Sequence, residues 1–259
     1  MRHSVRRSLR DCTGDLQRYR EERRMNKLYR KNQVLFAVLW IAAYCLIITP
    51  IRGQMGDDSL VMLAALAVFA CVITMFVRAN QLSGIFGIDH WPGDTGQFLH
   101  FIPMWVLATG NLWGGIHPAR GMPNQMFAAL SMVMVGYVEE MIFRGFLFGA
   151  MYRTGNVRRA VCVSALTFGI GHILNLFTGQ ATLETAVQIV FAVLWGFILT
   201  LVYLKSGSLW PSILAHAMID LFAEFAMPNE MMSWVYVIVT IIAGIPYCIY
   251  LSRKPDKLH

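Results

Sequence analysis

Long hydrophobic stretches separated by short polar ones dominate this chain. A helix that crosses about 30 Å of hydrocarbon needs roughly 20 mostly apolar residues. The third candidate stretch is the weakest because it contains His100, Pro103 and Asn111, and the fourth is the longest and contains charges. We therefore expect an all-α, polytopic membrane protein, a bundle of about eight transmembrane helices. The candidate stretches are 33–51, 59–77, 97–113, 124–150, 160–177, 184–204, 209–226 and 232–251.

The composition supports a membrane protein. Of the 259 residues, 56% are hydrophobic and 14% are charged, whereas soluble domains are about 45–50% apolar and about 25% charged. The length fits one membrane domain. We expect a basic cytoplasmic N-terminal arm over residues 1–32, a transmembrane helical domain over 33–252 and a short cytoplasmic tail over 253–259.

Basic residues predict the orientation. Residues 1–32 contain eleven Lys or Arg against four Asp or Glu, and the loop 151–159 and the tail are also basic. Cytoplasmic loops carry an excess of Lys and Arg, so both termini are expected in the cytoplasm. An arm beside a hydrophobic span is expected to lie on anionic lipid headgroups and not on nucleic acid. No cleavable signal peptide is visible, which together with the size favours a bacterial plasma membrane.

Ionisable residues inside the spans are the most informative feature. Such residues cost about 2.5–3.5 kcal/mol each at mid-bilayer, so a cluster of them indicates a functional site. Glu140 lies thirteen residues before Arg153, and His172 lies thirteen after Arg159, which is about 20 Å along a helix in both cases. Separate helices thus place polar groups at similar depths. The cluster consists of Glu139, Glu140, Arg144, His172, His216 and Asp220.

Helical spacing indicates roles within this cluster. Glu140 and Arg144 are four residues apart and can pair on one face; taken alone, they favour a structural ion pair. Glu139 is turned about 100° away, which leaves it free to act as a general base. His216 and Asp220 form a second pair of this spacing, able to donate hydrogen bonds or position a carbonyl oxygen.

Three short motifs resemble those of the CPBP family, the CAAX proteases and bacteriocin-processing enzymes also called Abi. The pattern EExxxR stands at Glu139–Arg144, FxxxH at Phe168–His172, and HxxxN or HxxxD at His216–Asp220. The resemblance covers about residues 124–222. Each motif alone is weak, but all three in order on hydrophobic helices are specific.

The resemblance implies an eight-helix intramembrane endopeptidase that acts on a membrane-associated or prenylated-like peptide, with the site opening toward the cytoplasm. Glu139 is then the base that activates water, assisted by His172, while His216 and Asp220 stabilise the oxyanion. The residues expected to support the site are Glu140, Arg144, Phe168 and Asn175. The sequence itself leaves open whether Asn175 is a support of the site or only a polar contact between helices.

The resemblance leaves the role of metal open. The family is often described as metalloproteases, yet a metal-free glutamate mechanism has also been advanced for it. Glu139, His172 and His216 could supply three Zn²⁺ ligands with one position open for water, but the HExxH pattern of soluble zinc proteases is absent. We expect no tightly bound metal. An ionised Asp220 would oppose an oxyanion, so it is protonated, paired to His216, or a metal ligand.

Two other classes of function compete with the peptidase. A non-catalytic membrane scaffold, such as a bacteriocin-immunity or signalling protein, would keep the bundle without the reaction. A proton-coupled transporter would also use buried carboxylates. The sequence shows no convincing internal repeat, which weighs against a transporter built from inverted halves.

Overall fold

The computed structural model describes residues 27–93 and 95–258, so most of the predicted basic arm lies outside the described residues. The described residues are overwhelmingly helical. The α-helices are α2 (Lys27–Lys31), α3 (Gln33–Met55), α4 (Leu60–Ala79), α5 (Thr95–Ala108), α6 (Asn124–Glu140), α7 (Gly149–Tyr152), α8 (Val157–Gly171), α9 (Thr182–Ser206), α10 (Trp210–Ala223) and α11 (Glu230–Ser252). Shorter 3-10 and π segments are η1 (Gly110–Leu112), η2 (Met141–Phe148) and η3 (His172–Thr178).

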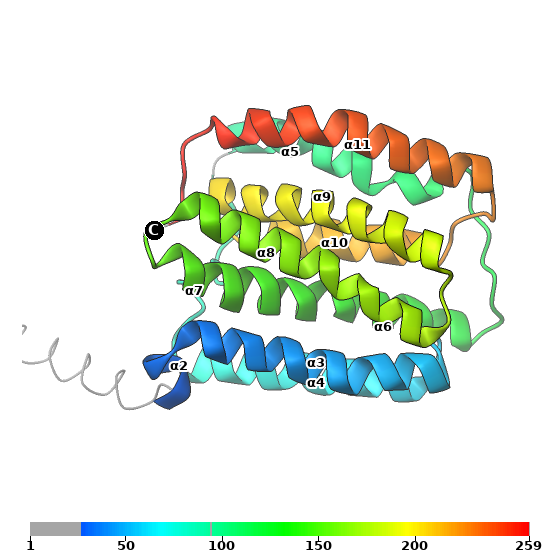
Figure 1. Ribbon diagram of the computed structural model, residues 1–259, viewed down its shortest axis with the longest axis horizontal. Coiled ribbons are helices and arrows are strands. Elements are labelled where there is room, and N and C mark those ends of the chain that lie inside the picture. Colours follow the sequence, from blue (N-terminus) through cyan, green and yellow to red (C-terminus); the bar gives the residue numbers. More distant parts are fainter. Residues whose placement is uncertain (1–26, 94, 259) are drawn as a thin grey trace, which may run out of the picture.

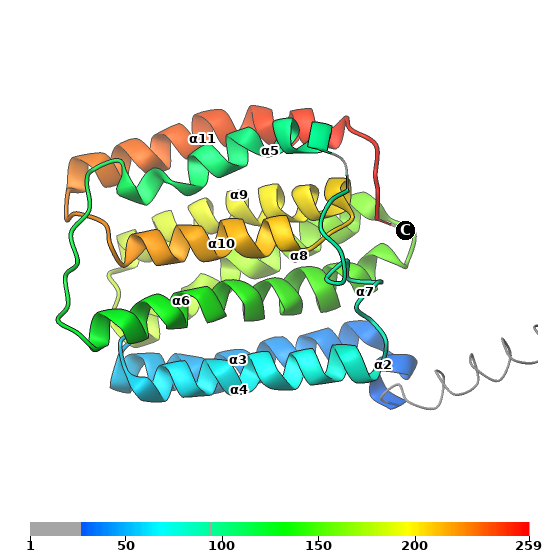
Figure 2. The same cartoon turned by 180° about the vertical axis from the view of Figure 1, so that it is seen from behind.

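The long helices lie side by side in successive layers (Figures 1 and 2). Helices α3 and α4 form one outer layer, and α5 and α11 form the opposite one. Between them, α6 packs on α4 and α10, and α8 packs on α9. The short helix α2 and the C-terminus lie at the same end of the bundle, on the left in Figure 1. We call this the α2 end, and the other the α3–α4 loop end. The chain is an integral membrane protein with an all-α, polytopic bundle, as predicted.

The expected count of eight spans is not confirmed. Within residues 27–93 and 95–258, six helical stretches are long and apolar enough to cross a membrane. The third and seventh expected spans correspond to α5 and α10, of fourteen residues each, which reach only about 21 Å at 1.5 Å per residue. Helix α5 stops before the 3-10 turn at Gly110, and α10 starts only after the left-handed residue Gly207. The expected stretch 97–113 extends past the turn at Gly110, and the stretch 209–226 extends past the end of α10 at Ala223, so both overestimate the helix length.

Side-chain caps fix where several helices begin. The side-chain oxygens of Asn32, Ser59, Asn156 and Asn229 each accept a hydrogen bond from the backbone N–H three residues later. Such caps satisfy backbone donors that have no partner within the helix, and each contributes about 1 kcal/mol. Each of these four residues lies between a polar loop and a hydrophobic stretch. The start of each of these helices is therefore determined by the local sequence.

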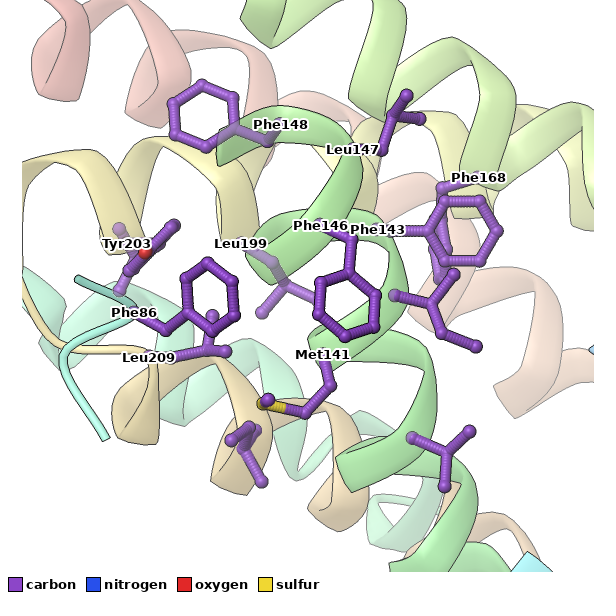
Figure 3. Close-up of a cluster of buried hydrophobic side chains, with 14 of the residues drawn as sticks. Phe86, Met141, Phe143, Phe146, Leu147, Phe148, Phe168, Leu199, Tyr203 and Leu209 are labelled. Atoms are coloured by element: carbon purple, nitrogen blue, oxygen red, sulfur yellow. The ribbon is translucent and has the colours of Figure 1, made fainter. Parts of the chain in front are cut away.

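The fourth span is one continuous helical stretch, Asn124–Tyr152, with a wide π-helical turn inside it. All eight residues of this π segment, Met141–Phe148, are buried. The hydrophobic side chains of this segment form a core rich in aromatic rings with Phe86, Tyr203 and Leu209 (Figure 3). The core occupies the part of the bundle between Glu140 and the α2 end. π-helical turns frequently occur at functional sites, and this one begins directly after Glu139 and Glu140.

Candidate active site

A completely buried ion pair anchors the polar cluster. Arg144 Nη1 donates a hydrogen bond to Glu140 Oε1 at 2.7 Å, and both side chains are 0% exposed. The pairing predicted from the spacing of four residues is therefore present. An isolated charge in this position would cost several kcal/mol, so the two groups depend on each other.

Helix α9 and the FxxxH motif complete the surroundings of Arg144. The guanidinium Nε lies 3.4 Å from Thr200 Oγ1, and Nη2 donates to the carbonyl of Gly196 at 3.3 Å. The ring of Phe168 lies under it, with its centroid 4.3 Å from Arg144 Cζ, in cation–π geometry. Arg144 is thus held by three helices.

His216 connects the ion pair to the rest of the site. Its Nδ1 lies 2.8 Å from Glu140 Oε1, the oxygen that also binds Arg144. Its Nε2 lies 3.3 Å from Asp220 Oδ2 and 3.8 Å from Glu139 Oε2. The ring of Phe168 packs against His216 at 5.4 Å and 90°. One imidazole therefore contacts all three acidic residues of the cluster.

Glu139 faces a cavity, unlike its neighbour Glu140. Its side chain is 12% exposed against 0% for Glu140. Its Oε1 accepts a hydrogen bond of 2.7 Å from the hydroxyl of Tyr44, which comes from α3. The two adjacent carboxylates thus have different environments, one locked in an ion pair and one open to a cavity, as the 100° turn between them predicts.

His172 and Asn175 also line this cavity. His172 starts the 3-10 segment η3 after α8 and packs its ring against Phe168 at 5.6 Å and 90°. Asn175 donates to the side chain of Gln188 on α9 at 2.8 Å. The Asn175 side chain therefore joins η3 to α9 while it also lines the cavity.

The cavity has a volume of about 390 Å³. At its inner end it is lined by Glu139, His172, His216 and Asp220, which are the four predicted catalytic residues. Toward its mouth it is lined by residues of the loops and helix ends at the α3–α4 loop end, namely Gly56, Asp57, Thr178, Gln180 and Glu224. The four residues come from three segments, α6, η3 and α10, and meet in one hollow.

The residues that line the cavity indicate the direction in which it opens. The cavity opens at the α3–α4 loop end, whereas the α2 end lies on the other side of the aromatic core. A cytoplasmic location of the termini and a site that opens to the cytoplasm, both expected above, are therefore incompatible. Spacing along a helix gives the depth of a residue in the membrane. It does not show toward which end of the bundle a cavity beside that residue opens.

The candidate zinc ligands do not form a metal-binding group. Across residues 27–93 and 95–258, no three His, Cys, Asp or Glu side chains come together in a set that could hold a metal ion. His216 already directs Nδ1 to Glu140, which leaves it one nitrogen for the cavity.

Sequence reasoning missed several residues that position this cluster. Tyr44 is an aromatic residue in an apolar span, and Thr200 is a small polar residue in another; neither stands out from its neighbours in the sequence. Gly136 is the clearest structural signal. A Cβ on Gly136 would lie 2.6 Å from the backbone nitrogen of Ala217, so only glycine lets α6 approach α10 beside His216.

These features define the class of protein: a polytopic membrane protein with a carboxylate–histidine centre in a cavity between its helices. Residues 121–222 match the family model described as "Type II CAAX prenyl endopeptidase Rce1-like". This model is one of the CPBP family, so the resemblance noted in the sequence is confirmed for this segment. Comparisons with curated proteins and with solved structures found no match.

Proposed function

We propose that this protein is an intramembrane endopeptidase that uses Glu139 to activate a water molecule. The observation that carries the proposal is the contrast between two adjacent carboxylates: Glu140 is sealed in an ion pair, and Glu139 faces a cavity that His172, His216 and Asp220 also line. The family match of this segment supports the same reaction.

Peptide hydrolysis would begin with a water molecule between Glu139 and His172. The Glu139 carboxylate takes a proton from the water, and the oxygen attacks the carbonyl carbon of the substrate. The Tyr44 hydroxyl, bound to Glu139 Oε1, leaves the other carboxylate oxygen for this proton. Glu139 then passes the proton to the amide nitrogen as the C–N bond breaks.

The oxyanion formed by this attack would be stabilised by His216 and Asp220. With Nδ1 directed at Glu140 and Nε2 at Asp220, the imidazole can carry protons on both nitrogens. The Nε2–H group would then shift from Asp220 Oδ2 to the oxyanion as the oxyanion forms. The contact of 3.3 Å between His216 Nε2 and Asp220 Oδ2 supports the paired state of Asp220. Glu140, Arg144 and Phe168 hold the histidine in place.

A decisive experiment compares wild type with Glu139→Ala after purification in detergent. Peptide libraries with prenylated and unprenylated ends serve as substrates, and zinc content is measured in the same samples. We expect Glu139→Ala to lower cleavage by about 10²–10⁴-fold, the usual contribution of a general base, while its melting temperature stays close to that of wild type.

Asp89→Ala provides the matched control, because Asp89 is a half-exposed carboxylate at the α2 end that pairs only with its neighbour His90 among the described residues. The Asp89→Ala protein is expected to cleave the peptides at the same rate as wild type. Equal cleavage by wild type and Glu139→Ala would contradict the proposal. Stoichiometric zinc whose removal abolishes cleavage would contradict the metal-free mechanism and leave the peptidase assignment intact.

A further inference from the structure

The two halves of the bundle are packed very differently on either side of Glu139. On the side of the α2 end, every residue of Met141–Phe148 is buried, and so is every residue of Ile198–Ser206. On the other side, only Thr185 and Ala192 are buried among residues 182–194 of α9. The site thus lies at the boundary between a close-packed half and a hollow half.

The α2 end is closed by two further segments. The C-terminal tail folds back: the backbone N–H of Lys257 donates to Leu204 O at 3.0 Å, and the Tyr152 hydroxyl donates to Leu258 O at 2.9 Å. The loop after α4 covers the start of α10, where Ser208 Oγ donates to Gly87 O at 2.9 Å. Together with the aromatic core of Figure 3, these contacts separate the site from the α2 end.

The hollow half holds a second space, with both apolar and polar walls, that joins the catalytic cavity. A cleft of about 680 Å³ lies between α9, α10 and α11 and shares Gln180, Gln188, Asp220 and Ala223 with the cavity. A cleft of this kind within the membrane suits a hydrophobic segment of a polypeptide. Its apolar lining is made by Leu183, Val187, Phe191, Ile219, Trp234 and Val237.

Charge distinguishes the two ends of the bundle. Of the fourteen described Lys and Arg residues, eleven lie at the α2 end, two at the α3–α4 loop end, and one is the buried Arg144. The two at the hollow end, Arg52 and Arg120, pair with Asp57, Asp58 and Glu224. Since Lys and Arg concentrate on the cytoplasmic side of membrane proteins, the closed end is the cytoplasmic one.

We infer that the catalytic cavity opens on the non-cytoplasmic side of the membrane. This inference rests on the proposed peptidase function and names its substrate class: a membrane-anchored polypeptide whose apolar segment lies in the cleft and whose scissile bond lies on the non-cytoplasmic side. A prenylated tail presented from the cytoplasm would meet the closed end.

Accessibility of the cavity can be tested without any cleavage. In a variant with the five native cysteines changed to alanine, Ala223→Cys reports on the cavity and Ser252→Cys on the exposed α2 end. A charged, membrane-impermeant maleimide is added to intact bacterial cells that produce each variant. We expect Ala223→Cys to be labelled in intact cells and Ser252→Cys only after permeabilisation. The reverse pattern overturns the inference, and Thr178→Cys at the cavity mouth provides an independent second reading.

Cleavage in cells then tests the substrate class. Single-span reporter proteins carry a randomised juxtamembrane stretch on either the cytoplasmic or the non-cytoplasmic side, and each is produced with wild type or Glu139→Ala. We expect Glu139-dependent cleavage of reporters with the non-cytoplasmic stretch. Cleavage confined to the cytoplasmic stretch overturns the inference. Labelling as expected with no cleavage on either side counts against the peptidase function and not against the direction of the opening.

Discussion

His216 Nδ1 lies 2.8 Å from Glu140 Oε1, the oxygen that also accepts the hydrogen bond from Arg144. Glu140 is therefore more than the counter-ion of an arginine: it fixes the ring of the histidine that faces the cavity. The other oxygen, Oε2, is buried with no hydrogen-bond partner within the described residues. All the polar contacts of this carboxylate thus converge on one atom, and any change to it affects both Arg144 and His216.

Replacing each of the two adjacent glutamates by glutamine should have opposite consequences. Glu140→Gln leaves Arg144 buried without a counter-charge, and breaking such a pair costs about 3–5 kcal/mol. Glu139→Gln breaks no close ion pair within the described residues, because the nearest basic atom to Glu139 there is His216 Nε2 at 3.8 Å. We expect Glu140→Gln to lower the melting temperature in detergent clearly, and Glu139→Gln to stay near wild type but lose cleavage. A stable Glu140→Gln protein would show that Arg144 finds another partner.

Removal of the Tyr44 hydroxyl should slow the reaction without affecting the fold. Tyr44→Phe keeps the ring, which packs on Phe69 at 5.7 Å, but removes the donor to Glu139 Oε1. Hydrogen bonds to charged groups contribute about 1.5–3 kcal/mol, so a decrease in kcat of about tenfold or more is expected.

The Michaelis constant distinguishes this role from a role in binding. Because Tyr44 contacts the base and not the apolar cleft, KM should change little while kcat falls. A variant in which only KM rises would place Tyr44 in substrate binding. Phe69→Leu, which alters the packing of Tyr44 but keeps its hydroxyl, is the control for an effect of packing alone.

The sequence could predict which residues gather in the polar cluster, because ionisable residues inside a hydrophobic span are energetically costly and therefore conspicuous. The Glu140–Arg144 pair followed from helical periodicity, and Glu139, His172, His216 and Asp220 do line one cavity. Tyr44 could not be predicted, because an aromatic residue within an apolar span is unremarkable unless the neighbouring helix is known. The direction of the opening depends on how the segment Met141–Phe148 packs, which no spacing along one helix encodes.

Asp220 should tolerate asparagine but not alanine. Asparagine retains an oxygen toward His216 Nε2, 3.3 Å away in the native pair, and adds an N–H group that can donate to an oxyanion. Alanine removes both functions. We expect Asp220→Asn to cleave at a rate near that of wild type, and Asp220→Ala to lose about 10²–10³-fold, as removal of an oxyanion donor does in other enzymes. Equal loss in both variants would indicate that the carboxylate itself is needed, as a metal ligand or proton carrier.

The close approach of α6 and α10 at Gly136 predicts that Gly136→Ala lowers the stability of the protein, which is the reverse of the usual effect of Gly→Ala in a helix. Gly→Ala inside a helix ordinarily stabilises by about 0.5–1 kcal/mol. At Gly136 the added Cβ would lie 2.6 Å from the backbone nitrogen of Ala217, so the helices must separate. Overpacking of this kind costs about 1–3 kcal/mol. Because His216 directly precedes Ala217, the same movement pulls its ring away from Glu140, and both melting temperature and kcat should fall. Gly121→Ala, where a Cβ meets nothing within 4 Å, is the control. A Gly136→Ala protein as stable as wild type would mean that α6 and α10 are less closely packed than described here.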